Sequence, residues 1–501
     1  MHRVDFGATA AAIVAVAAAV TSSSPRAPVL SRQDGNGSYP NYRISPLDGS
    51  IIALPTQDQL AFQDREMGML IHFEIATYIN IDGCNGVPGL VPSPSLFDPT
   101  LLNTDQWMDS AVDAGASYAT LVAKHNCGWL NWPSNITFET RENATVHYNY
   151  SVAYSPVKGT DVVGLFAASA ESRGLGHGFY YSTVVNNFLN VQNSLVNDTW
   201  GPGEVRITNA TYDDVVIEHL TELWTNYGTL TEVFPLELKL WFDGGYSASQ
   251  EEQIHDLLLE YQPQACIFNS CTTNGTCISS NAIRWIGTET GLPGIEIWSS
   301  GVTNDGGDPT SPYFAPAECD TTLQSGDRWF WGIDTPLRNL SEMIDVYHQT
   351  VGRNCILELD LSPDRSGLIP ASYAARYKEL GDFIRSCYGN PVDGSGIVNT
   401  TTATGLSFDF MRPTVIDRVA IMEDQKNGQV IRAYEVWAKI VDSTGMDGTL
   451  DVPWTLVSKG SSIGHKRIDI FSEAITVTGV LVNATRFADK PQWRSVNFYL
   501  C

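Results

Sequence analysis

The sequence predicts an α/β protein in which a (β/α)8-like barrel domain is followed by a C-terminal β-sandwich. Over residues 61–388, short apolar runs alternate with segments of helical periodicity, which is typical of a parallel sheet covered by helices. Over residues 397–501 the helical segments cease, and short apolar runs are separated by turn residues, as in a β-sandwich. A doubly wound open sheet is the alternative for the first domain, but no glycine-rich phosphate loop follows its first strand.

The elements of the first domain follow one another in a regular order. The expected strands are continuous apolar runs, so we expect both faces of the sheet to be covered. These strands are 67–73, 118–125, 176–182, 238–242, 265–269 and 356–361. The expected helices carry apolar residues at helical spacing, and several have a glycine at or just after their end. These helices are 104–115, 160–173, 212–227, 341–351 and 370–387.

The N-terminal segment is expected to lie outside the folded domains. Residues 1–24 combine a short start, a long run of alanine and valine, and small residues, which is the layout of a secretory signal peptide. An N-terminal membrane anchor is the alternative. Residues 25–60 are rich in Pro, Ser, Gly and Gln and predict a processed leader and a loose arm. Between the two domains, residues 389–396 form a linker with Pro and Gly.

Composition limits the partners and the compartment. The formal net charge of −26 would repel nucleic acid and anionic membrane surfaces, so we expect neither as a partner. Nine cysteines and ten Asn-x-Ser/Thr sequons agree with a secreted, extracellular glycoprotein. An odd number of cysteines leaves at least one without an intrachain partner, and Cys271 with Cys277 is the best single pair. The oligomeric state stays open.

Polar side chains stand at the ends of four successive expected strands. Aromatic residues accompany them, and this mixture suits a sugar, which has apolar ring faces and hydroxyl edges. The strand-end residues are His72, then Lys124, His125 and Asn126, then Tyr180, Tyr181 and Ser182, and finally Asp243. An aspartate before two glycines is often only a turn residue, and a lone histidine is more often structural. Their repetition at four strand ends favours an active site at the mouth of a barrel.

The motifs at these strand ends resemble those of α-L-fucosidases of glycoside hydrolase family 29. The stretch Lys124–Trp129, followed by Trp132-Pro133-Ser134, resembles the family's KHHDGF…lWpS motif. Further stretches resemble FIHFG, GLYYS, ELLTNYG and VWFDG, and they lie around His72, Tyr181, residues 222–228 and residues 240–244. Residues 284–291, RWIGTETG, resemble RWVGNE.G of the branch that prefers α-1,3/1,4 linkages, and 316–318 and 351–354 match further landmarks of that branch. The resemblance covers about residues 60–385.

The resemblance implies a retaining glycosidase that requires no metal and no organic cofactor. Asp243 would be the nucleophile that forms a covalent fucosyl-enzyme. Glu289 would be the general acid and base, which requires a raised pKa. Glu318 is the alternative acid and Glu296 a weaker candidate. The alternative role for Glu289 is a salt bridge with Arg284.

The same resemblance assigns substrate binding to His72, His125, Asn126, Tyr181, Trp241 and Glu318. The chain departs from the family pattern beside several of these residues. Asn126 and Cys127 stand where the family has His-Asp, Phe73 and Glu74 where it has Trp-Gly, and residues 82–89 replace its Glu-Trp loop. The family's contacts to the 3- and 4-hydroxyls of fucose therefore do not carry over directly.

The sequence thus predicts a secreted, N-glycosylated exo-α-L-fucosidase that acts on fucosylated oligosaccharides or glycans, with a preference for α-1,3/1,4 linkages. Three alternatives stay open. The first is the same chemistry on another linkage, such as the α-1,2-fucose of xyloglucan. The second is a fucose-binding protein on a catalytically weak barrel, and the third is a barrel hydrolase of another sugar. The C-terminal domain is expected to pack against the barrel, with glycan binding as its alternative role.

Overall fold

The computed structural model describes residues 40–84, 87–200, 205–234, 245–268, 270–271, 275, 277–441 and 452–501. Several predictions fall outside these residues. They concern the signal peptide at 1–24, the strand at 238–242, and the site residues Trp241 and Asp243. A shorter strand, β10 (Glu232–Phe234), is described just before that stretch.

Eight parallel strands form the sheet of the first domain. In pairing order they are β10, β11 (Cys266–Phe268), β12 (Ala282–Trp285), β13 (Ala317–Thr321), β14 (Cys355–Leu361), β3 (Met67–Ile71), β4 (Tyr118–Lys124) and β7 (Gly176–Tyr181). Because β7 pairs in turn with β10, the hydrogen bonding closes the sheet on itself. The expected parallel sheet is therefore present, and its closed pairing differs from a doubly wound open sheet.

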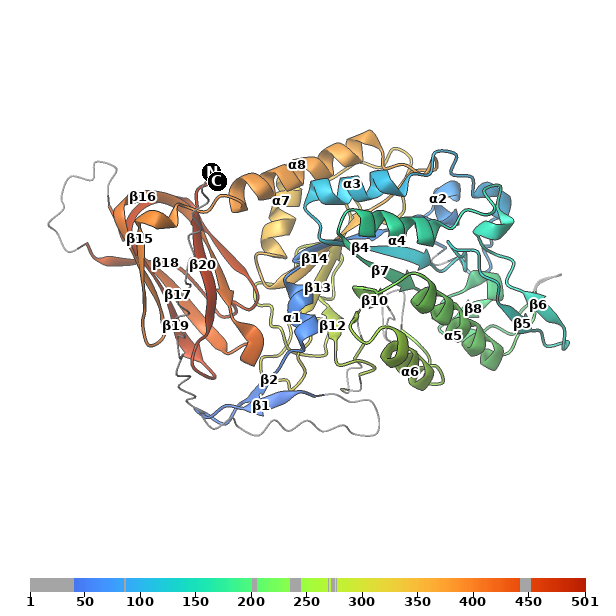
Figure 1. Ribbon diagram of the computed structural model, residues 1–501, viewed down its shortest axis with the longest axis horizontal. Helices are drawn as coiled ribbons and strands as arrows, with labels where there is room; N and C mark the ends of the chain where they lie inside the picture. Colours follow the sequence, from blue (N-terminus) through green and yellow to red (C-terminus); the bar gives the residue numbers. More distant parts are fainter. Residues whose placement is uncertain are drawn as a thin grey trace, which may run out of the picture.

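Helices follow most of these strands. They are α2 (Ile75–Ile79) and α3 (Thr104–Ala114) after β3, α4 (Val162–Ser172), α5 (Asn209–Asn226), α6 (Glu251–Tyr261), α7 (Leu340–Gln349) and α8 (Ala371–Tyr388). Helices α8, α3 and α4 lie side by side on the outside of the sheet (Figure 1). In the described part of the chain, no helix separates β11 from β12 or β12 from β13. The regular alternation expected of a (β/α)8 barrel is therefore incomplete on this side.

Local sequence explains where the covering helices begin and end. In α3, the Asn103 side chain accepts the N–H of Gln106, and Gly115 ends the helix in the left-handed conformation. Trp107 and Ala111 lie on its buried face. Strand β4 is buried along its whole length because helices cover one of its faces and the barrel interior the other.

The N-terminal end of the barrel is filled by aromatic rings. The ring of Tyr118 lies over Gly68, where a Cβ would come within 2.2 Å of the tyrosine Cζ. Phe62 of α1 (Gln57–Gln63) packs against Tyr118, with ring centroids 5.2 Å apart. Helix α1 therefore closes this end of the barrel, and Gln59 anchors it by donating to the carbonyls of Ala282 and Phe314.

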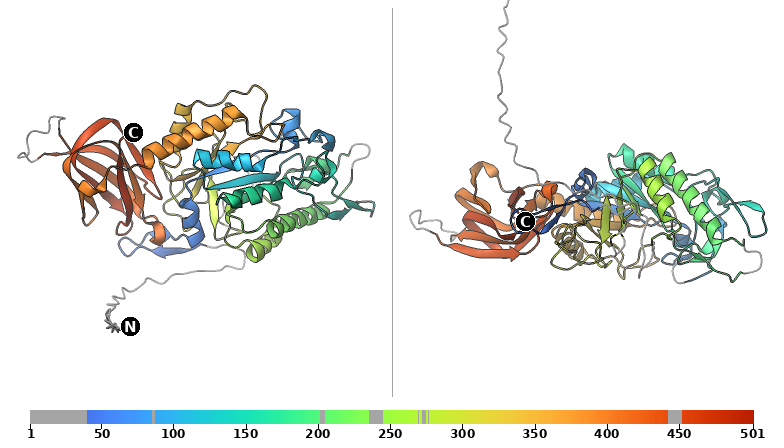
Figure 2. Two further views of the ribbon diagram at one scale, coloured as in Figure 1. Left: turned by 45° about the horizontal axis from the view of Figure 1, so that its top comes forward. Right: turned by 90° about the horizontal axis from the view of Figure 1, so that it is seen from below.

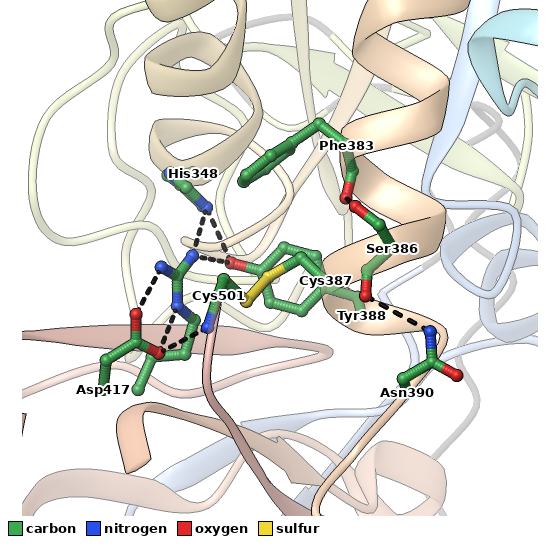
Figure 3. Close-up of a disulfide and its surroundings, with 9 residues drawn as sticks. His348, Phe383, Ser386, Cys387, Tyr388, Asn390, Asp417 and Cys501 are labelled. Atoms are coloured by element: carbon green, nitrogen blue, oxygen red, sulfur yellow. Dashed lines mark hydrogen bonds and ion pairs between the residues drawn. A yellow bond between two sulfur atoms is a disulfide. The ribbon is translucent and has the colours of Figure 1, made fainter. Parts of the chain in front are cut away.

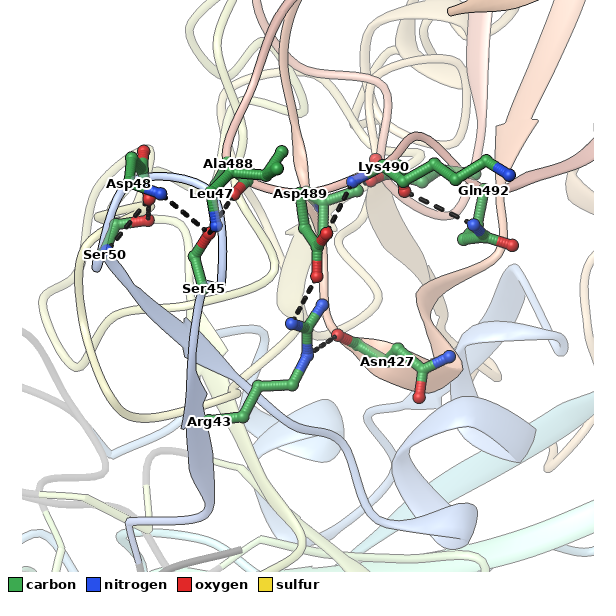
Figure 4. Close-up of polar contacts among 12 residues, drawn as sticks. Arg43, Ser45, Leu47, Asp48, Ser50, Asn427, Ala488, Asp489, Lys490 and Gln492 are labelled. Atoms are coloured by element: carbon green, nitrogen blue, oxygen red, sulfur yellow. Dashed lines mark hydrogen bonds and ion pairs between the residues drawn. The ribbon is translucent and has the colours of Figure 1, made fainter. Parts of the chain in front are cut away.

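Residues 40–60, expected as part of a loose arm, are ordered. β1 (Tyr42–Ile44) and β2 (Ile51–Ala53) pair as an antiparallel hairpin. Figure 4 shows how this hairpin contacts the C-terminal domain. Arg43 donates to the Asp489 carboxylate at 2.5 Å and to the carbonyl of Asn427 at 3.0 Å. Composition alone suggested a loose arm here because the contacts that order the hairpin come from residues about 400 positions away.

The C-terminal domain is a six-stranded antiparallel sheet beside the barrel (Figure 2). Its strands are β15 (Ile397–Thr401), β16 (Gly405–Glu423), β17 (Ile431–Ile440), β18 (Trp454–Gly460), β19 (Arg467–Phe487) and β20 (Trp493–Tyr499). A sandwich of two sheets was expected, whereas the hydrogen bonds join all six strands in one sheet. Register shifts within the long strand β16 bend it, and β15 and β20 pair with its two ends in turn.

A covalent bond joins the two domains. Cys387 in the last turn of α8 forms a disulfide with Cys501 at the end of the chain (Figure 3). Beside it, Arg418 of β16 donates to the Tyr388 hydroxyl at 3.1 Å and to the carboxylate of Asp417. These contacts fix the position of the C-terminal sheet relative to α8.

Candidate active site

Three strand ends bring an imidazole and phenol cluster together at the C-terminal end of the barrel. His72 follows β3, His125 follows β4, and Tyr180 lies near the end of β7. The ring centroids of His72 and His125 are 6.0 Å apart, and His125 stacks on Tyr180 at 5.6 Å. All three side chains are buried. The two histidines predicted from sequence motifs therefore share one site.

Two aromatic residues from the loop after β13 complete this cluster. The rings of Trp329 and Phe330 lie 5.0 Å and 5.1 Å from the His72 ring, and Phe330 lies 5.2 Å from His125. Neither was predicted from the sequence, because an aromatic pair in an irregular loop has no periodicity that assigns it to a site. The cluster thus offers apolar ring faces beside polar edges.

A buried carboxyl group supports His72 from a neighbouring strand. Asp360 of β14 has its Oδ1 2.9 Å from the His72 Nδ1. Burial raises the pKa of Asp360 well above its usual range and lowers the pKa of His72 well below its own. Both shifts favour the neutral forms of the two groups. This contact holds the imidazole ring in one orientation toward the site.

Glu289 lies at the same end of the barrel, in the loop after β12. The Trp329 indole N–H donates to its Oε2 at 3.1 Å. An antiparallel bridge between Thr290 and Thr321 holds this loop against the end of β13. Burial raises the pKa of Glu289, and the nearby carboxylates of Asp327 and Asp82 raise it further. A half-buried carboxyl with a raised pKa has the property that a general acid requires.

Arg284 does not form the alternative salt bridge with Glu289. Its guanidinium group donates instead to the backbone carbonyls of Trp298, at 2.7 Å, and of Asp305. These bonds anchor the long loop between β12 and β13. Burial lowers the pKa of Arg284 to about 10.

A second carboxyl group, Asp320 of β13, lies close to Glu289 and was not predicted. Its Oδ1 accepts the indole N–H of Trp285 at 2.7 Å. Burial raises the pKa of Asp320 well above its usual range, and the charge of Glu289 adds to this effect. Strand alternation could have revealed it, because Asp320 must face the same side as the predicted Glu318.

Glu318 itself is buried deeper along the same strand. It is paired in register with Trp285 on one side and with Ile356 on the other, and Ile356 belongs to the apolar interior of the barrel. Asp320 precedes Thr321, the residue whose bridge to Thr290 holds the Glu289 loop. Of the two acids on β13, Asp320 is therefore the one beside Glu289.

Two further predicted residues are not part of the cluster. Tyr181 lies on the outer side of β7, where its hydroxyl is 2.8 Å from the His219 Nδ1 on α5. Asn126 is buried, and its Oδ1 accepts the hydroxyl of Ser182 at 2.8 Å, which joins the loops after β4 and β7. Of the two neighbouring tyrosines, Tyr180 is therefore the one that lies in the cluster with His125.

The departures from the family motifs at Cys84 and Cys127 are linked, because these two cysteines form a disulfide. The bond joins the loop after β3 to the loop after β4, directly beside His125. The expected pair Cys271–Cys277 is confirmed, and a further disulfide joins Cys319 to Cys355. Four disulfides therefore use eight of the nine cysteines, and the ninth, Cys266, lies in β11.

The described residues form neither a metal centre nor a membrane span. Within these ranges, no group of three or more His, Cys, Asp or Glu side chains is placed to hold a metal ion. The helices of this part of the chain are all too short or too polar to cross a membrane.

Comparison with known proteins places this site in a family. The family model for alpha-L-fucosidases matches residues 91–389. Alpha-L-fucosidase 1 of Arabidopsis thaliana is 29% identical over 383 residues, which cover 72% of this chain and 66% of the plant protein. This chain therefore spans about two thirds of the length of that relative.

Solved structures share the fold. A glycoside hydrolase 29 family member from an unknown rumen bacterium is 25% identical, with a TM-score of 0.74 over 90% of this chain and 78% of its own. A GH29 fucosidase from Ruminococcus gnavus, solved in complex with fucose, has 19% identity and a TM-score of 0.67 over 91% of this chain and 97% of its own. Because the family model matches more than half of the sequence, the chain belongs to the alpha-L-fucosidase family of glycoside hydrolases.

Proposed function

We propose that this protein is a secreted, retaining exo-α-L-fucosidase that releases terminal α-1,3- or α-1,4-linked L-fucose from oligosaccharides or glycoconjugates. The position of Glu289 carries this proposal: a carboxyl with a raised pKa lies beside the aromatic and imidazole cluster at the barrel mouth. The irregular barrel would act as the (β/α)8-like catalytic domain and the C-terminal sheet as its β-sandwich partner.

In the proposed reaction Asp243 attacks the anomeric carbon while Glu289 protonates the leaving oxygen. A fucosyl-enzyme forms, and Glu289, now ionised, removes a proton from the water that hydrolyses it. The two carboxyl groups of a retaining enzyme lie about 5–5.5 Å apart. Asp243 is outside the described residues, so its role rests on the motif. The Trp329 N–H binds Oε2 of Glu289 and thereby leaves Oε1 to carry the proton.

The histidines would bind fucose as neutral rings. Burial, with the nearby charge of Lys124, lowers the pKa of His125 to about 3, and burial lowers that of His72. Neutral imidazoles can donate and accept hydrogen bonds with sugar hydroxyls without a buried charge. Trp329 and Phe330 would pack against the apolar face of the sugar. Substrate binding is therefore expected to change little across the neutral pH range, in contrast to the protonation of Glu289.

The linkage preference rests on the likeness of residues 284–291 to the α-1,3/1,4 branch. The Ruminococcus protein of the same fold binds fucose, which supports fucose as the sugar held here.

Four disulfides support an oxidising compartment and hence secretion. Release of fucose from α-1,2-linked xyloglucan fragments is the second candidate. Parallel assays on Lewis-type trisaccharides and on those fragments separate the two.

The direct test is release of 4-nitrophenol from 4-nitrophenyl α-L-fucoside by the native protein and by Asp243→Ala and Glu289→Ala. We expect Asp243→Ala to lose activity and to form a fucosyl azide of inverted configuration when azide is added. We expect Glu289→Ala to be slowed mainly on substrates with poor leaving groups. Wild-type activity in Asp243→Ala would contradict the mechanism, and turnover of another aryl glycoside but not of any fucoside would contradict the substrate.

A further inference from the structure

Two loops that are distant in the sequence are bound together beside Glu289. One is the segment 80–84 after β3, and the other is the segment 328–333 after β13. The Asp82 Oδ1 accepts the backbone N–H groups of Trp329 at 3.0 Å and Phe330 at 2.9 Å. These hydrogen bonds join residues separated by about 250 positions, so the two loops form one unit at the mouth of the barrel.

Asn80 strengthens the same connection two residues earlier. Its side-chain Oδ1 accepts the N–H of Ile333 at 3.0 Å and a guanidinium N–H of Arg328 at 3.3 Å. The two side chains, Asn80 and Asp82, therefore hold the segment 328–333 at both of its ends. Asp82 is half-buried, and burial raises its pKa.

The bound loop reaches the proposed general acid directly. Asp82 accepts the backbone N–H of Trp329, and the indole N–H of the same residue donates to Glu289 at 3.1 Å. Its ring also lies 5.0 Å from His72. A displacement of the Trp329 backbone would therefore change both the hydrogen bond to Glu289 and the contact of the Trp329 ring with His72.

The segment that carries Asp82 is itself fixed in place. Cys84 forms the disulfide with Cys127, two residues beyond His125. Between Asp82 and Cys84, Gly83 adopts φ +67°, and a Cβ there would lie 2.6 Å from the His125 ring. Only glycine fits this conformation and this contact. The disulfide at Cys84 and the contact of Gly83 with the His125 ring therefore hold Asp82 in place.

We propose that Asp82 is a positioning residue: it holds Trp329 against Glu289, and the Cys84–Cys127 disulfide holds Asp82. This inference rests on the proposed role of Glu289 as general acid. Asp82 belongs to the loop after β3, and its carboxylate accepts backbone N–H groups of the loop after β13. Asp82 therefore affects the reaction rate through the position of Trp329, and no sugar-binding motif of the sequence includes it.

The pair Asp82→Ala and Asp82→Asn separates geometry from charge. The asparagine variant would keep an oxygen that accepts both backbone N–H groups, whereas alanine would leave them without that partner. We expect Asp82→Ala to lower kcat/KM on the aryl fucoside by about 10–100-fold, because a displacement on the order of 1 Å near the reacting groups has this effect. We expect Asp82→Asn to restore most of that loss. Asp345→Asn, an exposed acid on α7, is the matched control and should leave kinetics unchanged.

The pH profile provides a readout that a purely structural role would not move. The carboxyl groups that face Glu289 are Asp82, Asp327 and Asp320, from three different segments. Removing the charge of Asp82 lowers the pKa of Glu289, so the basic limb of kcat/KM should move to lower pH in Asp82→Asn. The Asp345→Asn profile should coincide with wild type.

A spectroscopic measurement makes the inference independent of turnover. In protein labelled with 5-fluorotryptophan, the resonance that disappears in Trp329→Phe reports the environment of Trp329. We expect this resonance to shift in Asp82→Ala and in the double variant Cys84→Ser/Cys127→Ser, and to stay in place in Asp82→Asn. An unshifted resonance in Asp82→Ala, or a shifted one with wild-type kinetics, would overturn the inference. Failure of the proposed function would appear separately, as a Glu289→Gln variant with an unchanged pH profile and leaving-group dependence.

Discussion

Tyr180 and Tyr181 are neighbours in the sequence but lie on opposite sides of β7. Tyr180 faces the barrel interior and stacks on His125, whereas Tyr181 faces α5 and contacts His219. Successive side chains of a strand alternate between its two faces, so only one of the two can reach the site. The motif YYS contains both residues and does not say which one that is.

These two tyrosines give a paired prediction. Tyr181→Phe leaves the buried His219 Nδ1 without the hydroxyl, so we expect the free energy of unfolding to fall by about 1–3 kcal/mol while kcat/KM stays unchanged. Tyr180→Leu removes the stacked ring beside His125, worth about 0.5–1.5 kcal/mol, so we expect kcat/KM to fall about two- to tenfold. Urea denaturation and fucoside kinetics measure both. A loss of activity in Tyr181→Phe with none in Tyr180→Leu would show that the motif assignment was right.

At the scale of elements, the barrel depends on one small residue in β3. Gly68 leaves the space that the Tyr118 ring fills, and the distance of 2.2 Å from a hypothetical Cβ to that ring is far below van der Waals contact. Tyr118 in turn packs on Phe62 of α1, which closes the N-terminal end of the barrel. The pairing of β3 with β4 and the position of α1 are therefore coupled through a single ring.

Substitution at Gly68 tests this coupling. We expect Gly68→Ala to lower the free energy of unfolding by about 1–3 kcal/mol, because the added methyl group must displace a buried ring. Gly294→Ala is the matched control, since no atom lies within 4 Å of a Cβ there. Denaturation curves of both variants provide the measurement. Equal stability of the two variants would mean that the ring of Tyr118 can move without cost.

At the scale of the whole molecule, a charged cluster joins the barrel to the C-terminal sheet. The Glu66 carboxylate accepts from Lys466 and lies 3.4 Å from His465, and Arg494 contacts Asp64. Burial alone would raise the pKa of Glu66, but the interactions with His465 and Lys466 outweigh it and lower that pKa to about 2. Together with the Cys387–Cys501 disulfide, these contacts connect the two domains at separate places.

The lowered pKa of Glu66 predicts a pH dependence of stability. In the unfolded chain this carboxyl titrates near its ordinary value of 4.5, and in the folded protein near 2. Its contribution is therefore fully present above pH 4.5 and is lost as the pH falls toward 2. We expect Glu66→Gln to be less stable than wild type near neutral pH, with a difference that shrinks on acidification. Urea denaturation at pH values above and below the ordinary carboxyl pKa measures this, and a difference that grows on acidification would contradict it.

The sequence by itself determined the family and the parallel strands with strong apolar runs, and its motifs predicted a set of site residues. The helix expected at 104–115 is α3, and His72, His125 and Glu289 meet at one end of the barrel. Short strands such as β12 and β13 escaped prediction, because four or five residues that include Arg, Glu and Asp have no continuous apolar run. Asp320 escaped with them.

Only the tertiary structure decided which side of β7 faces His72 and His125, and which loops support Glu289. The contact between Asp82 and Trp329 spans 247 positions, and the bond between Cys84 and Cys127 spans 43. Local patterns of apolar and polar residues specify the elements because burial and backbone geometry act over a few neighbouring residues. These local patterns do not predict contacts between loops. Such contacts arise only when the closed sheet brings the ends of β3, β4, β12 and β13 to the same end of the barrel.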